Sequence, residues 1–170
     1  MNWEDGCYCN PEIREKLNAM IRYQKPEERN QQLFEHYIDE LFTLPFFKRT
    51  LVPPPPIGRI VKHFHEMSIH IPGYPHNIKM RLTGPRGSTI KKMEDFCKCS
   101  INVHHINYNY VKIFIVCLDY GNIAKWRTDV AIKCINDVLH IPANGIDFVM
   151  KMQMDELAVR NGTYENCLMK

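Results

Sequence analysis

Residues 81–92, RLTGPRGSTIKK, place a Gly-x-x-Gly loop, Gly84 to Gly87, directly before a run of residues with helical spacing. Glycine lacks a Cβ, so both glycines can adopt backbone dihedrals closed to other residues and let a sugar-phosphate strand lie against the loop. Arg86 adds a positive charge, and Ser88 and Thr89 are good N-caps for the following helix, whose first amides would face the same place. The stretch predicts an anion-binding loop, with an ordinary turn as the alternative for an isolated Gly-x-x-Gly.

The composition is that of a globular protein. The chain has 170 residues, of which 45% are hydrophobic and 24% charged, enough for one core and an accessory element. A net charge of +3 and a pI near 8.4 permit a polyanionic partner without requiring one. No stretch approaches the roughly 18 apolar residues of a membrane span, and the first residues lack the pattern of a signal peptide, so we expect an intracellular protein without a membrane partner.

The cysteines and histidines give weak signals. Seven cysteines, an odd number, without a secretion signal favour free thiols. The Cys-x-Cys pairs at 7/9 and 97/99 lack the Cys-x-x-Cys spacing of zinc sites, and the histidine pairs at 63/65 and 104/105 are equally weak, so we expect no metal. Because no carboxylate pair or nucleophile set has a recognisable spacing, we expect neither an enzyme nor a bound cofactor.

The proline run at 53–56 divides the chain and predicts a stiff extended spacer. Before it, apolar residues recur at three- and four-residue intervals in two short helices separated by Lys25-Pro26. Two such helices cannot enclose a core, so they would pack on the main domain or on a second copy of themselves. Self-association is the sharper hypothesis, through Leu17, Ile21, Leu33, Tyr37 and Leu41.

The chain after the prolines predicts an α+β domain. We expect a strand at 67–71, a short helix leading to the glycine loop, a helix at 89–96, strands at 101–105 and 111–118 joined by a turn at 107–109, and a helix at 123–139. The order is β-α-α-β-β-α. The expected organisation is a helical hairpin at 10–48, a linker at 49–65, the domain at 66–142 and a carboxy-terminal helix and tail at 143–170.

This order, with the glycine loop between the first two helices, resembles a eukaryotic-type (type I) KH domain, in which a three-stranded antiparallel sheet packs on three helices. Residues 151–164, KMQMDELAVRNGTY, resemble the carboxy-terminal quaking-homology helix of the STAR family of RNA-binding proteins. The similarity covers roughly residues 66–165 and includes Tyr74-Pro75, Gly84–Gly87, Lys91, Glu94 and the run at 99–103. Residues 33–41, LFEHYIDEL, resemble the second helix of the hairpin through which family members form homodimers.

The resemblance implies a single-stranded RNA-binding site. The backbone from Gly84 through Pro85 and Arg86 to Gly87 would carry the phosphates, and Arg81 and Lys91 would flank them. The remaining implied contacts are Asn77, Ile90 and Ile101 beside the loop, and Lys151, Gln153, Leu157, Ala158 and Arg160 on the carboxy-terminal helix. Ordinary core packing is the alternative for the two isoleucines, as is docking of the last helix for Leu157 and Ala158.

Three departures from the family pattern predict weaker or less specific binding, limited to a short U/A-rich element such as UAAY. His104 replaces a basic residue, Glu165 replaces an arginine, and the loop around Asn107 is short. The implied function is regulation of pre-mRNA splicing or of mRNA stability and translation by a homodimer in the nucleus, with the cytoplasm as a second location. The alternative is a protein-interaction module that keeps the KH fold but has lost RNA binding.

Overall fold

The computed structural model describes residues 10–163, and the chain forms two compact units. One unit combines the chain up to Lys48 with the chain from Gly145 onward, and the other is Arg49–Asn144. The first and last helical segments, which the sequence treats as separate elements, therefore belong to the same unit.

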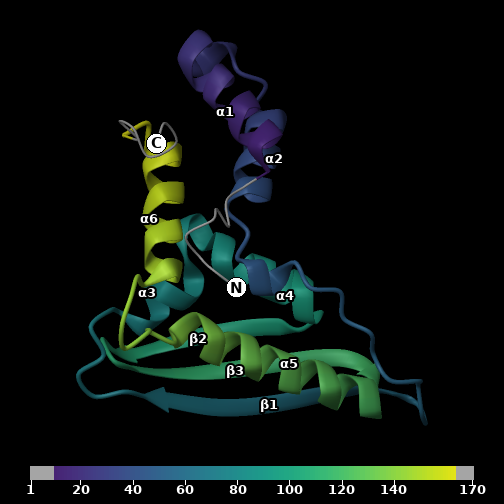
Figure 1. The fold of residues 1–170 in the computed structure, drawn as a ribbon. Helices are drawn as coiled ribbons and strands as arrows, with labels where there is room; N and C mark the ends of the chain where they lie inside the picture. Colours follow the sequence, from purple (N-terminus) through teal and green to yellow (C-terminus); the bar gives the residue numbers. More distant parts are fainter. Residues whose placement is uncertain (1–9, 164–170) are drawn as a thin grey trace. The chain divides into compact units, whose positions relative to one another are not determined.

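The unit Arg49–Asn144 is built on a three-stranded antiparallel sheet (Figure 1). Its strands are β1 (Ile60–His70), β2 (Ser100–Asn107) and β3 (Tyr110–Tyr120), in the order β1-β3-β2. Helices α3 (Ile78–Thr83), α4 (Ser88–Cys97) and α5 (Gly121–Leu139) pack against one face of this sheet, where alternate β3 residues such as Ile113 and Ile115 are fully buried. The predicted α+β class and the order β-α-α-β-β-α are confirmed, and the arrangement is compatible with a KH-like fold.

Strand β1 begins at Ile60 rather than at Met67, so part of the segment that we assigned to the linker belongs to the sheet. Side chains along β1 alternate between the two faces, but the helix-facing positions include His63 and His65 and the solvent-facing ones include Phe64. Because these inward positions hold histidines instead of apolar residues, the first half of β1 does not show the apolar–polar alternation by which a strand is recognised in a sequence. The imidazole Nδ1 of His63 lies 3.1 Å from the Thr128 hydroxyl on α5, which satisfies it inside the unit.

The proline run also belongs to this unit. Its residues lie outside helices and strands, as expected for an extended segment. The side chain of Asn122 at the start of α5 donates to the Pro55 carbonyl at 2.8 Å and accepts from the Ile57 amide at 3.0 Å. The segment is therefore tied to α5 instead of serving only as a spacer.

The other unit contains α1 (Pro11–Tyr23), α2 (Gln31–Leu41) and α6 (Phe148–Asn161), with short 3-10 turns at Pro26–Glu28 and Pro45–Phe47. Asn10 and Asn30 cap α1 and α2, each accepting a hydrogen bond from the amide three residues later. The two helices contact each other, and the break between them falls at Lys25-Pro26 as the sequence predicts. No helix within residues 10–163 is long and apolar enough to cross a membrane.

Candidate nucleic-acid interface

The glycine loop has a backbone that only a glycine-rich sequence accepts readily. Gly84, Arg86 and Gly87 all have positive φ, of 72°, 51° and 75°. Gly84 combines this φ with a ψ of 178°, a region that is almost exclusive to glycine, and a Cβ there would lie 2.0 Å from the Thr89 hydroxyl oxygen. The resulting turn, Pro85–Gly87, leaves the Arg86 side chain exposed.

The helix after the loop starts one residue earlier than we expected from Ser88 and Thr89. Its N-cap is Gly87, which offers no side chain, whereas Ser88 is the first helical residue and Thr89 is buried. The first turn of α4 contains no acidic residue. The positive end of the helix dipole therefore meets no carboxylate of its own first turn and adds to the charge of Arg86 beside it.

Arg81 corrects the predicted site. We expected its charge to flank phosphates, but only 3% of this residue is exposed. Its Nε donates to the Val138 carbonyl at 2.7 Å and its Nη2 to the His140 carbonyl at 3.3 Å. Arg81 thus caps the carboxy-terminal end of α5, where cations are favourable and orphan carbonyls need donors. Tyr74 helps by donating its hydroxyl to the Leu139 carbonyl at 2.6 Å.

The other predicted residues beside the loop divide into two groups. Lys91 is exposed and Ile90 half-buried on α4, which leaves both accessible near the loop. Ile101 is only 5% exposed and is a core residue, so the expectation that it touches bases is corrected in favour of the alternative. Asn77 is the N-cap of α3, because its Oδ1 accepts from the Met80 amide at 3.0 Å.

Sequence reasoning assigned Glu94 only to the resemblance, but the structure gives it a definite structural role. Its Oε1 accepts a hydrogen bond from the Ile101 amide at 2.8 Å. This bond ties the start of the edge strand β2 to α4, the helix that follows the loop. A carboxylate one helical turn from the end of a helix gives no sequence signal for such a partner.

On α6, the predicted contacts separate by face. Lys151 and Leu157 are exposed, and Gln153 and Ala158 are half-buried. Arg160 corrects the prediction, because its side chain is only 6% exposed and lies among carboxylates of its own unit. Its Nη1 is 2.6 Å from Glu35 Oε2, and its Nη2 is 3.6 Å from Asp39 and 3.7 Å from Glu156. A buried guanidinium requires such partners, and they take the place of RNA phosphates.

The predicted dimer contacts are corrected in part. Leu17 is fully buried and Leu41 is 1% exposed, so both pack inside the chain rather than against a second copy. Ile21 and Tyr37 are half-buried, and Leu33 is 39% exposed. An i, i+4 pattern identifies an apolar stripe but does not say whether the same chain already covers it.

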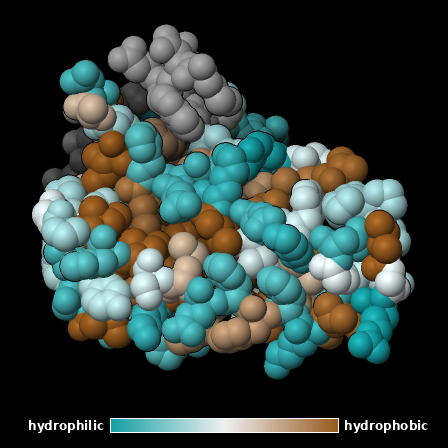
Figure 2. All heavy atoms as spheres, turned by 90° about the horizontal axis from the view of Figure 1, so that it is seen from below, coloured by the Kyte–Doolittle hydropathy of each residue, from teal (hydrophilic) through white to brown (hydrophobic). Residues whose placement is uncertain are grey.

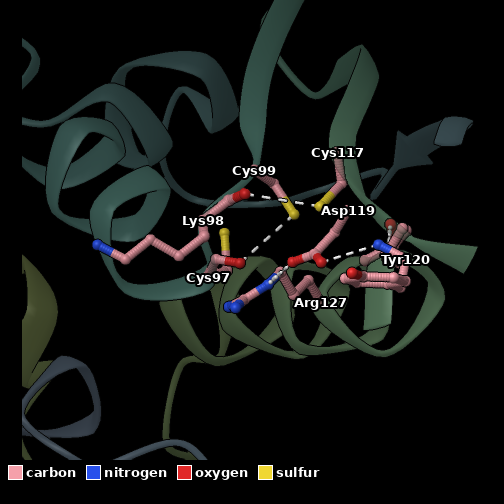
Figure 3. A network of polar contacts seen from close by, with 9 residues as sticks. Cys97, Lys98, Cys99, Cys117, Asp119, Tyr120 and Arg127 are labelled. Atoms are coloured by element: carbon pink, nitrogen blue, oxygen red, sulfur yellow. Dashed lines mark hydrogen bonds and ion pairs between the residues drawn. The ribbon is translucent and has the colours of Figure 1, made fainter. Parts of the chain in front are cut away.

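A network of cysteines lies where α4, β2, β3 and α5 meet (Figure 3). Cys97, Cys99, Cys117 and Cys134 are buried free thiols, and within residues 10–163 no group of three or more histidine, cysteine or acidic side chains could hold a metal ion. Burial raises the pKa of Cys117 and raises that of Cys134 to about 12, so these two thiols stay protonated at neutral pH. These cysteines are best explained as core packing.

Next to these thiols, Arg127 donates its Nε to Asp119 Oδ2 at 2.9 Å (Figure 3). The other carboxylate oxygen accepts from the Tyr120 amide at 2.8 Å. The hydrogen bond from Arg127 holds the pKa of Asp119 below its usual value. The ion pair joins the end of β3 to α5. We assign it a structural role and not a part in the glycine-loop site.

A search against models of known protein families finds none that matches this chain. Cys7, Cys9 and Glu165 lie outside the described residues. The site therefore rests on the loop Gly84–Gly87, with Ile90 and Lys91 beside it.

Proposed function

We propose that this chain is a STAR-like, single-stranded RNA-binding protein whose Arg49–Asn144 unit is a type I KH domain. The observation that carries the proposal is the loop Gly84–Gly87. Three positive φ angles, an exposed Arg86 and the positive end of α4 come together in one turn. Such a turn suits close contact with a sugar-phosphate backbone, and a KH loop clamps four nucleotides in this way.

The bases would then lie beside the loop, against Ile90, with Lys91 near the phosphates. Because Arg81 and Arg160 are engaged with protein groups, the cationic contacts are fewer than the sequence implied. This supports a short recognition element, U/A-rich and UAAY-like, bound with modest affinity. Contacts from Lys151, Gln153, Leu157 and Ala158 on α6 would lengthen the element that is read.

The biological role that follows is regulation of pre-mRNA splicing, or of mRNA stability and translation, in the nucleus, with the cytoplasm as a second location. Homodimerisation through α1 and α2 would place two modest sites on one transcript and raise the avidity through effective concentration. The exposed Leu33 and half-buried Ile21 and Tyr37 are the residues that remain for that contact. Neither catalysis nor a cofactor is part of this proposal.

The test is fluorescence anisotropy of the full chain with a labelled single-stranded RNA that carries two UAAY elements, compared with a scrambled RNA at two salt concentrations. We expect salt-sensitive binding that prefers UAAY. Replacing both Pro85 and Arg86 with aspartate should abolish binding at unchanged circular dichroism, because negative charge would then lie where phosphates bind. Equal binding by this variant and the natural chain would remove the loop from the function.

A second candidate is a protein-interaction module that keeps the fold without binding RNA. The observation in its favour is the loss of two expected cationic contacts, Arg81 and Arg160, to internal partners, together with a net charge of only +3. Absence of binding to either RNA in the anisotropy experiment would favour this candidate.

A further inference from the structure

The face of the sheet opposite the three helices carries a row of ring side chains, one from each strand. Phe64 on β1 and Phe114 on β3 stack with ring centroids 5.8 Å apart and an interplanar angle of 29°. His104 on β2 meets the Phe114 ring edge-on, at 5.0 Å and 90°. These rings lie across the sheet in one continuous contact.

The strand register produces this row. Phe64 pairs with Val116 and His104 pairs with Lys112, so each lies diagonally across from Phe114. Diagonal neighbours on one face of a sheet are within reach of aromatic side chains. The row keeps accessible surface, because Phe64 is 58% exposed, His104 is exposed and Phe114 is half-buried. A second ring pair, His70 and Tyr110, continues along the same face with centroids 5.2 Å apart.

The charged residues around the row are two lysines and one glutamate, a small excess of positive charge. Lys62 lies two residues from Phe64 on β1, and Lys112 two residues from Phe114 on β3, so both belong to the same face. Glu66 is the one acidic residue that β1–β3 place on this face, and its Oε1 lies 3.6 Å from the Lys112 Nζ in an exposed ion pair. A ligand with phosphates beside flat apolar groups would complement this arrangement.

The composition of the face argues against a protein partner as its occupant. Lysine and glutamate are depleted in the buried centre of protein interfaces, whereas here Lys112 and Glu66 flank the central ring, Phe114. The surface of the molecule seen from the side of the edge strand β1 shows apolar areas interrupted by hydrophilic side chains (Figure 2). Ile60 and Leu118, two further exposed apolar residues, lie toward the end of the face at which β1 begins, on the Phe64 side of the row.

We propose that this open face is a second binding site for single-stranded RNA, in which unpaired bases stack on Phe64 and Phe114 and Lys62 and Lys112 contact phosphates. Base–aromatic stacking needs only an accessible ring face and tolerates any base, so this site adds affinity without strong sequence preference. The inference shares its ligand class with the proposed function but uses none of the residues of the glycine loop.

The test compares two oligouridylates, one of about four nucleotides, the length that a KH loop clamps, and one of about twelve. In the full chain we expect Phe64→Thr with Phe114→Thr to weaken binding of the long RNA at least about five-fold and to leave the short one unchanged, since each stacked base contributes about 1–3 kcal/mol. Threonine keeps the β-propensity of both positions. Ile60→Thr, on the same face but four residues from Phe64 on β1, is the matched control and should change neither affinity.

A measurement on the natural chain makes the test independent of folding. Photocrosslinking with 4-thiouridine in the long RNA, mapped by mass spectrometry, should mark peptides that contain Phe64 or Phe114. Unchanged affinity in the double variant together with no crosslink to either peptide overturns the proposal. So does a double variant that changes the mass in light scattering but not the RNA affinity, which would assign the face to a protein contact.

The two proposals fail separately. Aspartates at Pro85 and Arg86 should weaken binding of both RNAs, whereas the sheet variant should affect only the long one. If the loop variant binds RNA normally and the sheet variant does not, the glycine loop is not an RNA-binding site and the open face remains as the proposed one.

Discussion

Arg81 and Arg86 lie five positions apart and have the same sequence-level prediction, but the structure gives them opposite roles. Arg81 is buried and bonds carbonyls at the end of α5, whereas Arg86 is exposed in the glycine loop. The partner of Arg81 is separated from it by 57 residues, so no local pattern could reveal it. Arg86, by contrast, lies in the short turn between Gly84 and Gly87, which the local sequence does identify.

This difference predicts opposite effects of the two alanine variants. Arg81→Ala should lower the free energy of unfolding by about 2–3 kcal/mol, because buried carbonyls lose a charged donor, and leave the RNA affinity of the folded fraction unchanged. Arg86→Ala should leave stability within about 0.5 kcal/mol and reduce the salt slope of RNA binding by about 0.7. Urea unfolding and anisotropy at several salt concentrations measure both. A loss of affinity in Arg81→Ala without loss of stability would contradict the capping role.

The two loop glycines should also differ in how much an alanine substitution destabilises the fold. Gly84→Ala should destabilise the fold by at least about 2 kcal/mol, because its backbone conformation is almost exclusive to glycine and the added Cβ would collide with the Thr89 side chain. Gly87→Ala should cost only about 1 kcal/mol, since the space around it is open and only the positive φ opposes alanine. Thermal unfolding of the two variants side by side gives the comparison. Equal losses would mean that Thr89 moves away readily and that packing does not fix the loop.

At the scale of elements, the sequence predicts the order and type of the helices and strands well and their boundaries less well. Helix periodicity located α4 and α5, and alternation located β2 and β3, because an apolar side of each faces the core. The start of β1 was missed because His63 and His65 occupy inward positions, and a histidine satisfied by Thr128 looks like a loop residue in sequence. The open-face row was missed as well, since it depends on the register between strands and not on any one strand.

The ion pair between Asp119 on β3 and Arg127 on α5 should make the free energy of unfolding depend on pH in the acidic range. Because the pKa of Asp119 is lower in the folded chain, its ion pair with Arg127 contributes fully above the ordinary aspartate pKa of about 3.9. The contribution is lost as the pH falls through the lower folded-state pKa, since the unfolded chain then binds the additional proton. Asp119→Asn should therefore be less stable than the natural chain at pH 7, with a difference that narrows as the pH falls below about 4.

Urea unfolding of both proteins from pH 7 to pH 3 measures this difference. Asp129→Asn is a suitable control, because the ion pair of Asp129 with Lys125 is exposed and spans 3.9 Å. A difference between Asp119→Asn and the natural chain that stays constant with pH would contradict the assignment to ionisation.

At the scale of the whole molecule, the sequence does not predict that the first and last helical segments belong to the same compact unit. The resemblance assigns α6 to the RNA groove, but Arg160 pairs with Glu35, 125 residues earlier, in the unit that contains α1 and α2. The sequence shows the i, i+4 relation between Arg160 and Glu156 and nothing of Glu35 or Asp39. Long-range ion pairs of this kind depend on tertiary packing, which periodicity does not encode.

The hairpin provides the last prediction, because burial separates residues that could reach a second chain from residues that hold the first together. Tyr37→Glu together with Leu33→Glu should convert a dimer to a monomer at unchanged helicity, since both positions retain exposed surface on α2. Leu41→Glu, the matched control on the same helix, should instead lower the melting temperature, because it places a charge where only 1% of the side chain is accessible. Light-scattering mass with circular dichroism distinguishes these results. A natural chain that is monomeric at micromolar concentration, or a Tyr37/Leu33 variant whose mass is unchanged, would remove α2 from any dimer and leave avidity on one transcript without a structural basis.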